Sequence, residues 1–143
     1  MHIRGIGGEF GLTLLHKTPN QSPDEPDLHV QCHAKTPLFI MEATNAWLEW
    51  PDVCAFVKEL AELNTTLNGK AEIYGMSPSD FTLTITNLDS KGHMGVSFTI
   101  GSRSHTDNGQ FKSCVTGGFE VLPSEVEALL SWFKAAITNE PDT

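Results

Sequence analysis

The most constraining feature of the sequence is a long alternation of apolar and small polar residues over residues 80–101. Apolar side chains take every second position from 81 to 85 and again from 94 to 100, and the positions between them are threonine, serine or glycine. This period of two is typical of antiparallel strands that bury one face and expose the other. Residues 87–92 between the two runs are typical of turns. The sequence therefore predicts a β-hairpin here.

Shorter runs predict further strands on either side of this hairpin. Alternation or apolar content indicates strands at 9–15, 28–34, 37–45, 71–74 and 111–122. The polar segments 18–27 and 102–109 are interpreted as loops, the second of them mobile. Gly117 and Gly118 suggest a bulge in the last strand.

Two helices follow from apolar residues at helical spacing. The first covers about 52–64, with Asp52 as its N-cap. The second covers about 124–138, and Ser124 with Glu127 matches a capping box. Together these elements predict an α+β fold, a twisted antiparallel β-sheet of about six to eight strands with two α-helices. The length fits one domain over residues 1–143.

The charge of the chain restricts its partners. Eighteen acidic residues against nine basic residues give a formal net charge of −9. This balance disfavours binding to nucleic acid or to an anionic membrane, which depends on clustered lysine and arginine. It fits a basic partner, and it fits equally a charge that only maintains solubility.

The cysteines and the first residues suggest a cellular location. Three widely spaced cysteines make a disulfide framework unexpected. The first seventeen residues contain only short apolar pieces, which fit neither a signal peptide nor a membrane span. We therefore expect a cytoplasmic protein.

No group of residues predicts catalysis, a cofactor or a metal site. His29 and His33 would share one face of a strand but lie about 13 Å apart, too far to bind one ion, and Cys32 would point to the opposite face. Cys54, near a helix N-terminus, is expected to be a small core residue. His93 opens a strand after a turn and has no carboxylate pair or nucleophile motif beside it. We expect no enzyme activity.

The segment 42–52 is the strongest candidate for a binding surface. It combines two tryptophans with three carboxylates, and the candidate contacts are Glu42, Trp47, Glu49, Trp50 and Asp52. Tryptophan is enriched in binding hot spots, and acidic groups steer basic partners. The alternative is that both indole rings pack over the core where a strand passes into a helix.

Three segments carry a resemblance to a known family. They are WL followed by DVCAFVKELAELNTTLNGKAEIYG, then DFTLTITNLDSKGHMGVSFTI, then GFEVLPSEVEALLSWFKAAI. In this order the chain resembles the WapI-type immunity protein family and related domains of unknown function. The shared pattern is a helix after a tryptophan strand, a GxA strand start, a GHxxV strand and a final strand-to-helix step led by phenylalanine. The resemblance covers 47–75, 81–100 and 119–137.

The resemblance implies an antidote that binds and neutralises a cognate bacterial toxin, often a nuclease with a basic cleft. It implies no catalytic residue, and it transfers no contact residue. An alternative is a small-molecule or carbohydrate-binding sheet domain in which Trp47, Trp50 and His93 line a pocket. A third possibility is a cysteine-dependent enzyme, which requires a histidine within hydrogen-bond reach of an exposed Cys54.

Overall fold

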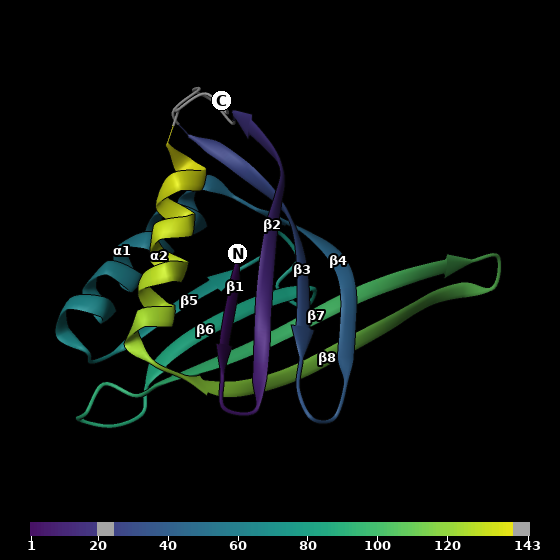
Figure 1. Cartoon of the computed structure of the whole chain (residues 1–143). Helices are drawn as coiled ribbons and strands as arrows, with labels where there is room; N and C mark the ends of the chain where they lie inside the picture. The colour runs from purple at the N-terminus through teal and green to yellow at the C-terminus, as the bar shows by residue number, and fades with distance from the viewer. Residues whose placement is uncertain (20–24, 139–143) are drawn as a thin grey trace.

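Within residues 1–19 and 25–138 the protein forms two antiparallel sheets of four strands each and two helices (Figure 1). This computed structural model describes residues 1–19 and 25–138. The strand order is β1–β2–β3–β4 in the first sheet and β5–β6–β7–β8 in the second. The strands are β1 His2–Gly5, β2 Gly8–Pro19, β3 Pro26–Lys35, β4 Ile40–Leu48, β5 Lys70–Tyr74, β6 Phe81–Asn87, β7 Met94–Thr106 and β8 Gly109–Val121. The predicted α+β class is confirmed, but the strands form two sheets where one was expected.

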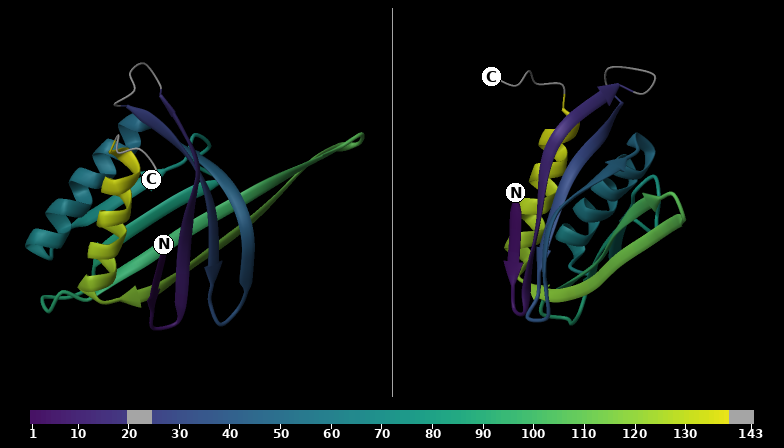
Figure 2. Two further views of the ribbon diagram at one scale, coloured as in Figure 1. Left: turned by 45° about the horizontal axis from the view of Figure 1, so that its top comes forward. Right: turned by 90° about the vertical axis from the view of Figure 1, so that its right-hand side faces the viewer.

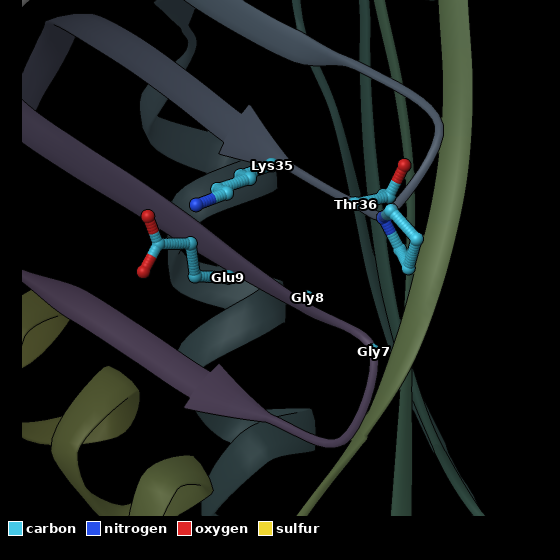
Figure 3. Close-up of a pocket in the computed structure, with 6 residues that line it drawn as sticks. Gly7, Gly8, Glu9, Lys35 and Thr36 are labelled. Atoms are coloured by element: carbon cyan, nitrogen blue, oxygen red, sulfur yellow. The ribbon is translucent and has the colours of Figure 1, made fainter.

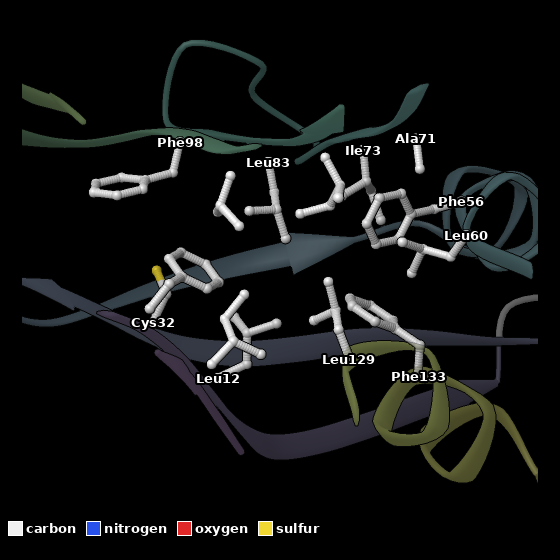
Figure 4. Packing of buried hydrophobic residues seen from close by; sticks show 14 of the residues in the cluster. Leu12, Cys32, Phe56, Leu60, Ala71, Ile73, Leu83, Phe98, Leu129 and Phe133 are labelled. Carbon is white, nitrogen blue, oxygen red and sulfur yellow. The ribbon is translucent and has the colours of Figure 1, made fainter. Parts of the chain in front are cut away.

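The two sheets lie face to face, and their strands cross (Figures 1 and 2). The inward side chains of both sheets form one apolar core, part of which is shown in Figure 4. Phe10 of β2 joins the sheets, because its ring centroid lies 5.7 Å from that of Phe98 in β7 and 6.4 Å from that of Phe81 in β6. The alternating pattern of β6 and β7 predicted this burial correctly, since Phe81, Leu83 and Ile85 are all buried.

Two helices close one side of the space between the sheets. Helix α1 (Trp50–Thr66) packs against β5, helix α2 (Pro123–Ile137) contacts β1, and the helices contact each other. Their apolar stripes point toward the core (Figure 4). The rings of Phe56 and Phe133 pack edge to face, with 5.2 Å between their centroids. No helix in residues 1–19 and 25–138 is long and apolar enough to cross a membrane.

Both helices begin at residues other than the predicted caps. The N-caps are Glu49 and Leu122, neither of which makes a side-chain capping hydrogen bond, so the prediction of Asp52 and of the Ser124 capping box is wrong. A proline follows each N-cap in the first turn, where its fixed φ favours helix and its missing N–H is not needed. Helix α1 is therefore longer at both ends than predicted, and α2 agrees within a residue at each end.

The predicted loop at 102–109 is wrong. Strands β7 and β8 continue as a regular antiparallel ribbon to the pair Thr106 and Gly109. The ribbon projects past β4 into solvent (Figure 1), and residues 102–106 and 109–114 are exposed on both of its faces. No hydrophobic alternation marks it because neither face packs on a core.

The β7–β8 register also excludes the predicted bulge at Gly117 and Gly118. Gly117 lies directly opposite Phe98, and Gly118 opposite Ser97, without a shift in pairing. A Cβ atom at Gly117 would lie 2.8 Å from the end of the Phe98 ring. The glycine therefore makes room for a core side chain.

Candidate interaction site

The residues predicted as a binding surface lie on β4 and at the start of α1, and they do not form one cluster. Glu42 and Trp47 are five residues apart on β4, about 17 Å along an extended strand. Glu49, Trp50 and Asp52 lie together at the N-terminus of α1. The structure thus separates Glu42 from the other candidates.

Trp47 lies on the outer face of the first sheet. Its ring stacks on His29 of β3 with a centroid distance of 4.3 Å and an interplanar angle of 8°. The side chain is half-buried, and the Trp47 carbonyl accepts a hydrogen bond from the backbone N–H of Met76 (2.9 Å). Trp47 therefore does not belong to the buried core, and part of its ring is already covered.

The groups at the start of α1 have structural roles. The backbone N–H of Trp50 donates to Oδ1 of Asp27 (2.9 Å), so a carboxylate from β3 satisfies a free donor at the helix start. Glu49 and Asp52 are exposed at the same helix end, where the helix dipole favours negative charge. Both acids are therefore at a position that favours negative charge, and their side chains remain exposed.

Cys54 is exposed, and the expectation that it is a core residue is wrong. The buried stripe of α1 consists of Val53, Phe56, Leu60 and Leu63. Cys54 follows Val53 by one residue, a turn of about 100° that takes its side chain off the stripe. Within the described residues its thiol has no hydrogen bond to a histidine, which is the contact that cysteine-dependent catalysis would need.

His93 and Trp47, which the alternative hypothesis of a ligand-binding domain placed in one pocket, line separate cavities. Trp47 borders a cavity of about 170 Å³ beside Met76 and Phe81. His93 borders a cavity of about 260 Å³ at the junction of the two sheets. Trp47 and His93 do not share a cavity, so the hypothetical pocket of Trp47, Trp50 and His93 does not form.

The junction of the sheets is a backbone bridge between the β1–β2 turn and β8. The N–H of Ile6 donates to the carbonyl of Glu120 (2.8 Å), and the N–H of Glu120 donates to the carbonyl of Ile6 (3.3 Å). The neighbouring Gly5 lies so close that an added Cβ atom would be 1.7 Å from the Glu120 carbonyl oxygen. The absence of a side chain at Gly5 permits this approach.

The cavity of about 260 Å³ beside this bridge is the best candidate site, and we name it the corner pocket. It is lined by Arg4, Gly5, Ile6, His93, Glu120, Val121, Leu122 and Glu125. Two of its aliphatic side chains face solvent, Ile6 being 76% exposed and Leu122 61% exposed. Contiguous exposed apolar surface with a polar rim is one mark of an interaction site, and these two side chains belong to one pocket lining.

Two carboxylates of the corner pocket lack a cationic partner. Among the described residues neither Glu120 nor Glu125 forms an ion pair, whereas Arg4 is paired with Glu9 (Nε to Oε2, 3.2 Å). Glu125 lies in the first turn of α2, which fixes it at the mouth of the pocket. The pocket therefore offers unpaired negative charge beside apolar surface.

His93 is held by Asp89. Its Nδ1–H donates to Oδ2 of Asp89 (2.5 Å), and Oδ1 of Asp89 accepts from the backbone N–H of Lys91 (2.8 Å). The hydrogen bond to Asp89 raises the pKa of His93, and the negative charges of Asp89 and Glu120 act in the same direction. This pair positions a histidine at the pocket but supplies no nucleophile.

A second cavity, of about 310 Å³, lies between the β1–β2 and β3–β4 turns (Figure 3). Glu9 and Lys35 lie opposite each other on β2 and β3 at its wall, so the lining carries one charge of each sign. Its lining offers two glycines and Thr36 but no exposed aliphatic pair. The corner pocket is therefore the more specific binding feature.

Sequence reasoning missed the corner pocket because its lining comes from three distant parts of the chain. The bridge between the sheets brings residues 4–6 to residues 120–125, and the pairing of Met94 with Val121 brings His93 to the same place. The sequence offered only a leucine, Leu122, placed between the end of a strand and a proline. Comparison with models of known protein families, with curated proteins and with solved structures found no significant match.

Proposed function

We propose that this chain is an immunity protein that binds a basic bacterial toxin in the cytoplasm and neutralises it stoichiometrically, without catalysis or a cofactor. The observation that carries the proposal is the corner pocket, where two unpaired carboxylates lie beside two exposed aliphatic side chains. The resemblance to WapI-type immunity proteins and the net charge of −9 support the same function.

The chemistry of the pocket defines the expected contact. A lysine or arginine side chain of the toxin would place its charged end against Glu120 and Glu125. Its methylene stem would cover Ile6 and Leu122, because long basic side chains bury apolar stems while their charge stays near polar groups. Apolar contact and charge complementarity together are typical of interface hot spots.

The surface at the start of α1 is proposed as a second contact. Glu49, Trp50 and Asp52 add negative charge and an aromatic ring at one place. Trp47 lies near them in sequence, stacked on His29. Glu42, which is separated from these residues along β4, would contact a different part of the toxin.

The test is co-expression with the product of the reading frame immediately upstream. We expect the neighbour alone to stop growth, and co-expression with this chain to restore growth and yield a 1:1 complex. The variant Glu120→Gln/Glu125→Gln should lose much of the protection. The control Glu59→Gln/Glu62→Gln removes the same charge from α1 and should protect fully. A harmless neighbour that does not co-purify would contradict the proposal.

A further inference from the structure

The outer edge of strand β8 is open over most of its length. The N–H and the carbonyl of Glu120 point to this edge, because both bond to Ile6 there. Alternate residues of an antiparallel strand turn their backbone groups the same way, and the β7–β8 pairing has no shift in register. Before Glu120, the residues of β8 that share this direction are Gln110, Lys112, Cys114, Thr116 and Gly118.

These five outward positions have no backbone partner on the open side. Their backbone groups form no hydrogen bond there with any part of residues 1–19 and 25–138, and all five residues are exposed. Natural edge strands are usually protected by proline, a bulge or charged side chains. Residues 109–118 contain no proline and no bulge, and Lys112 is their only charged residue. The edge is therefore free to accept another strand.

The outer part of the β7–β8 ribbon also lacks a third strand. Strand β6 pairs with β7 only as far as Phe81, which lies opposite Ile100. The pairs from Ser102–Ser113 to Thr106–Gly109 form two strands that project past β4 with water on both faces (Figure 1). An isolated two-stranded ribbon is marginally stable in water, and a third strand stabilises it. A strand added at the β8 edge would supply this support.

The charge of the ribbon favours an acidic partner. Residues 102–114 carry Arg103 and Lys112 against the single acid Asp107, an excess of one positive charge, whereas the whole chain carries −9. Arg103 and Lys112 lie directly opposite each other, where like charges repel, and a basic strand would add to this repulsion. The rest of the chain is strongly acidic, so a second copy of the chain brings the complementary charge.

We propose that two copies of this chain pair through their β8 edges, antiparallel, with Cys114 of each copy at the twofold axis. The open edge runs from Gln110 to Gly118, and Cys114 is its middle residue. In this register each of the five outward residues lies opposite an outward residue of the other copy. The pairs exchange about ten backbone hydrogen bonds, which is the number found in a typical protein interface.

The ends of the edge exclude the neighbouring centred registers. An axis at Lys112 would place Lys112 opposite its own copy, and like charges in that position repel. An axis at Thr116 would place Lys112 opposite Glu120 of the other copy, whose backbone groups are already bound by Ile6. With the axis at Cys114, Lys112 lies opposite Thr116 and the whole open edge is used.

The first test is sedimentation equilibrium of the untagged, reduced chain. We expect a monomer–dimer equilibrium with a Kd on the order of 10–100 µM, because the contact is smaller than a standard interface. Thr116→Glu places a carboxylate opposite Lys112 of the other copy and should tighten the dimer about two- to tenfold. Thr116→Lys opposes like charges and should weaken it by a similar factor. Thr82→Glu and Thr82→Lys make the same charge changes two strands away on β6 and should leave Kd unchanged.

The second test is cross-linking, which reports the register. Residues paired in this way have Cα atoms about 5.5 Å apart, so a short bismaleimide should join the two Cys114 thiols. The variant Cys54→Ser retains the exposed Cys114 and should form a covalent dimer. The matched variant Cys114→Ser retains the exposed Cys54 and should stay monomeric.

The two tests can each contradict the proposal. Sedimentation as a monomer up to about 0.5 mM would leave the edge to a different partner and overturn it, because the expected Kd lies well below that concentration. Equal effects of Thr116→Glu and Thr116→Lys, or equal cross-linking of the two cysteine variants, would overturn it as well. None of these variants alters the corner pocket, so the result does not depend on the proposed toxin.

Discussion

Ile6 and Glu120 exchange two backbone hydrogen bonds, and through them the first sheet is joined to the second. The same bridge holds the exposed Ile6 side chain at the wall of the corner pocket beside Glu120. One pair of residues therefore connects the architecture of the fold with the candidate site.

Gly5→Ala should break this bridge. The added methyl group meets the backbone carbonyl of Glu120, which cannot move without separating the strands. We expect a loss of about 1–3 kcal/mol in the free energy of unfolding, measured by urea denaturation. Gly95→Ala is the matched control, because its nearest neighbours are the flexible Leu88 and Thr86 side chains, and it should change stability by less than about 1 kcal/mol. Equal effects of the two variants would contradict this role of the bridge.

His93 should titrate above the ordinary histidine pKa of 6.5 because Asp89 accepts its hydrogen bond. Asp89→Asn should lower the His93 pKa toward that value, as followed by NMR of the imidazole protons. An unchanged His93 pKa in Asp89→Asn would show that the contact is absent in solution.

The same pair sets a pH dependence of stability. Because the pKa of His93 is raised in the folded state, its protonation stabilises the fold. This stabilisation is complete below about pH 6.5 and is lost as pH rises through the folded-state pKa. Because the pKa of Asp89 is lowered in the folded state, its ionised form stabilises the fold. This stabilisation is present above about pH 3.9 and is lost as pH falls through the folded-state pKa. The difference in stability between wild type and Asp89→Asn should therefore be largest between these values.

The cysteines should differ in reactivity. Burial raises the pKa of Cys32 to about 12, and its Sγ–H donates to the Thr44 carbonyl (3.0 Å), whereas Cys54 and Cys114 are exposed. Because the thiolate is the reactive form, a thiol reagent at mildly alkaline pH should modify two cysteines per native chain and three after denaturation. Fast modification of three in the native protein would contradict the burial of Cys32.

The part of the fold that packs on the core could be predicted from the sequence. The hairpin of β6 and β7 was recognised because its apolar side chains alternate, and the stripe of α2 because it repeats at helical spacing. Strand β1 was missed because it has four residues and only one buried side chain, Ile3. The end of the β7–β8 ribbon was missed because water surrounds both of its faces.

The candidate site could not be predicted, because it depends on contacts between distant segments. The corner pocket needs the Ile6 bridge to Glu120. The predicted surface around Trp50 rested on residues that are neighbours in sequence. In the structure, Glu49 and Asp52 lie at the N-terminus of α1, where the helix dipole favours their negative charge.

The outer part of the ribbon should be dispensable for folding. Deleting 104–105 together with 110–111 keeps the strand alternation and retains Arg103, whose guanidinium donates to the hydroxyls of Ser77 and Ser79 (3.3 Å each). We expect the free energy of unfolding to change by about 0.5 kcal/mol or less, as for exposed positions in general. Arg103→Ala should cost more, up to about 1 kcal/mol, because it removes the ion pair with Asp80. A deletion that unfolds the protein would show that the ribbon supports the core.

The most direct test of the central claim is the association rate with the upstream-encoded toxin as a function of salt. For the wild type we predict fast association that slows from about 0.05 to 0.5 M salt, because ions screen the attraction between the acidic chain and a basic partner. In Glu120→Gln/Glu125→Gln the rate should be lower and its salt dependence weaker, with Glu59→Gln/Glu62→Gln close to wild type. A rate indifferent to salt, or equal behaviour of the two double variants, would contradict recognition through the corner pocket.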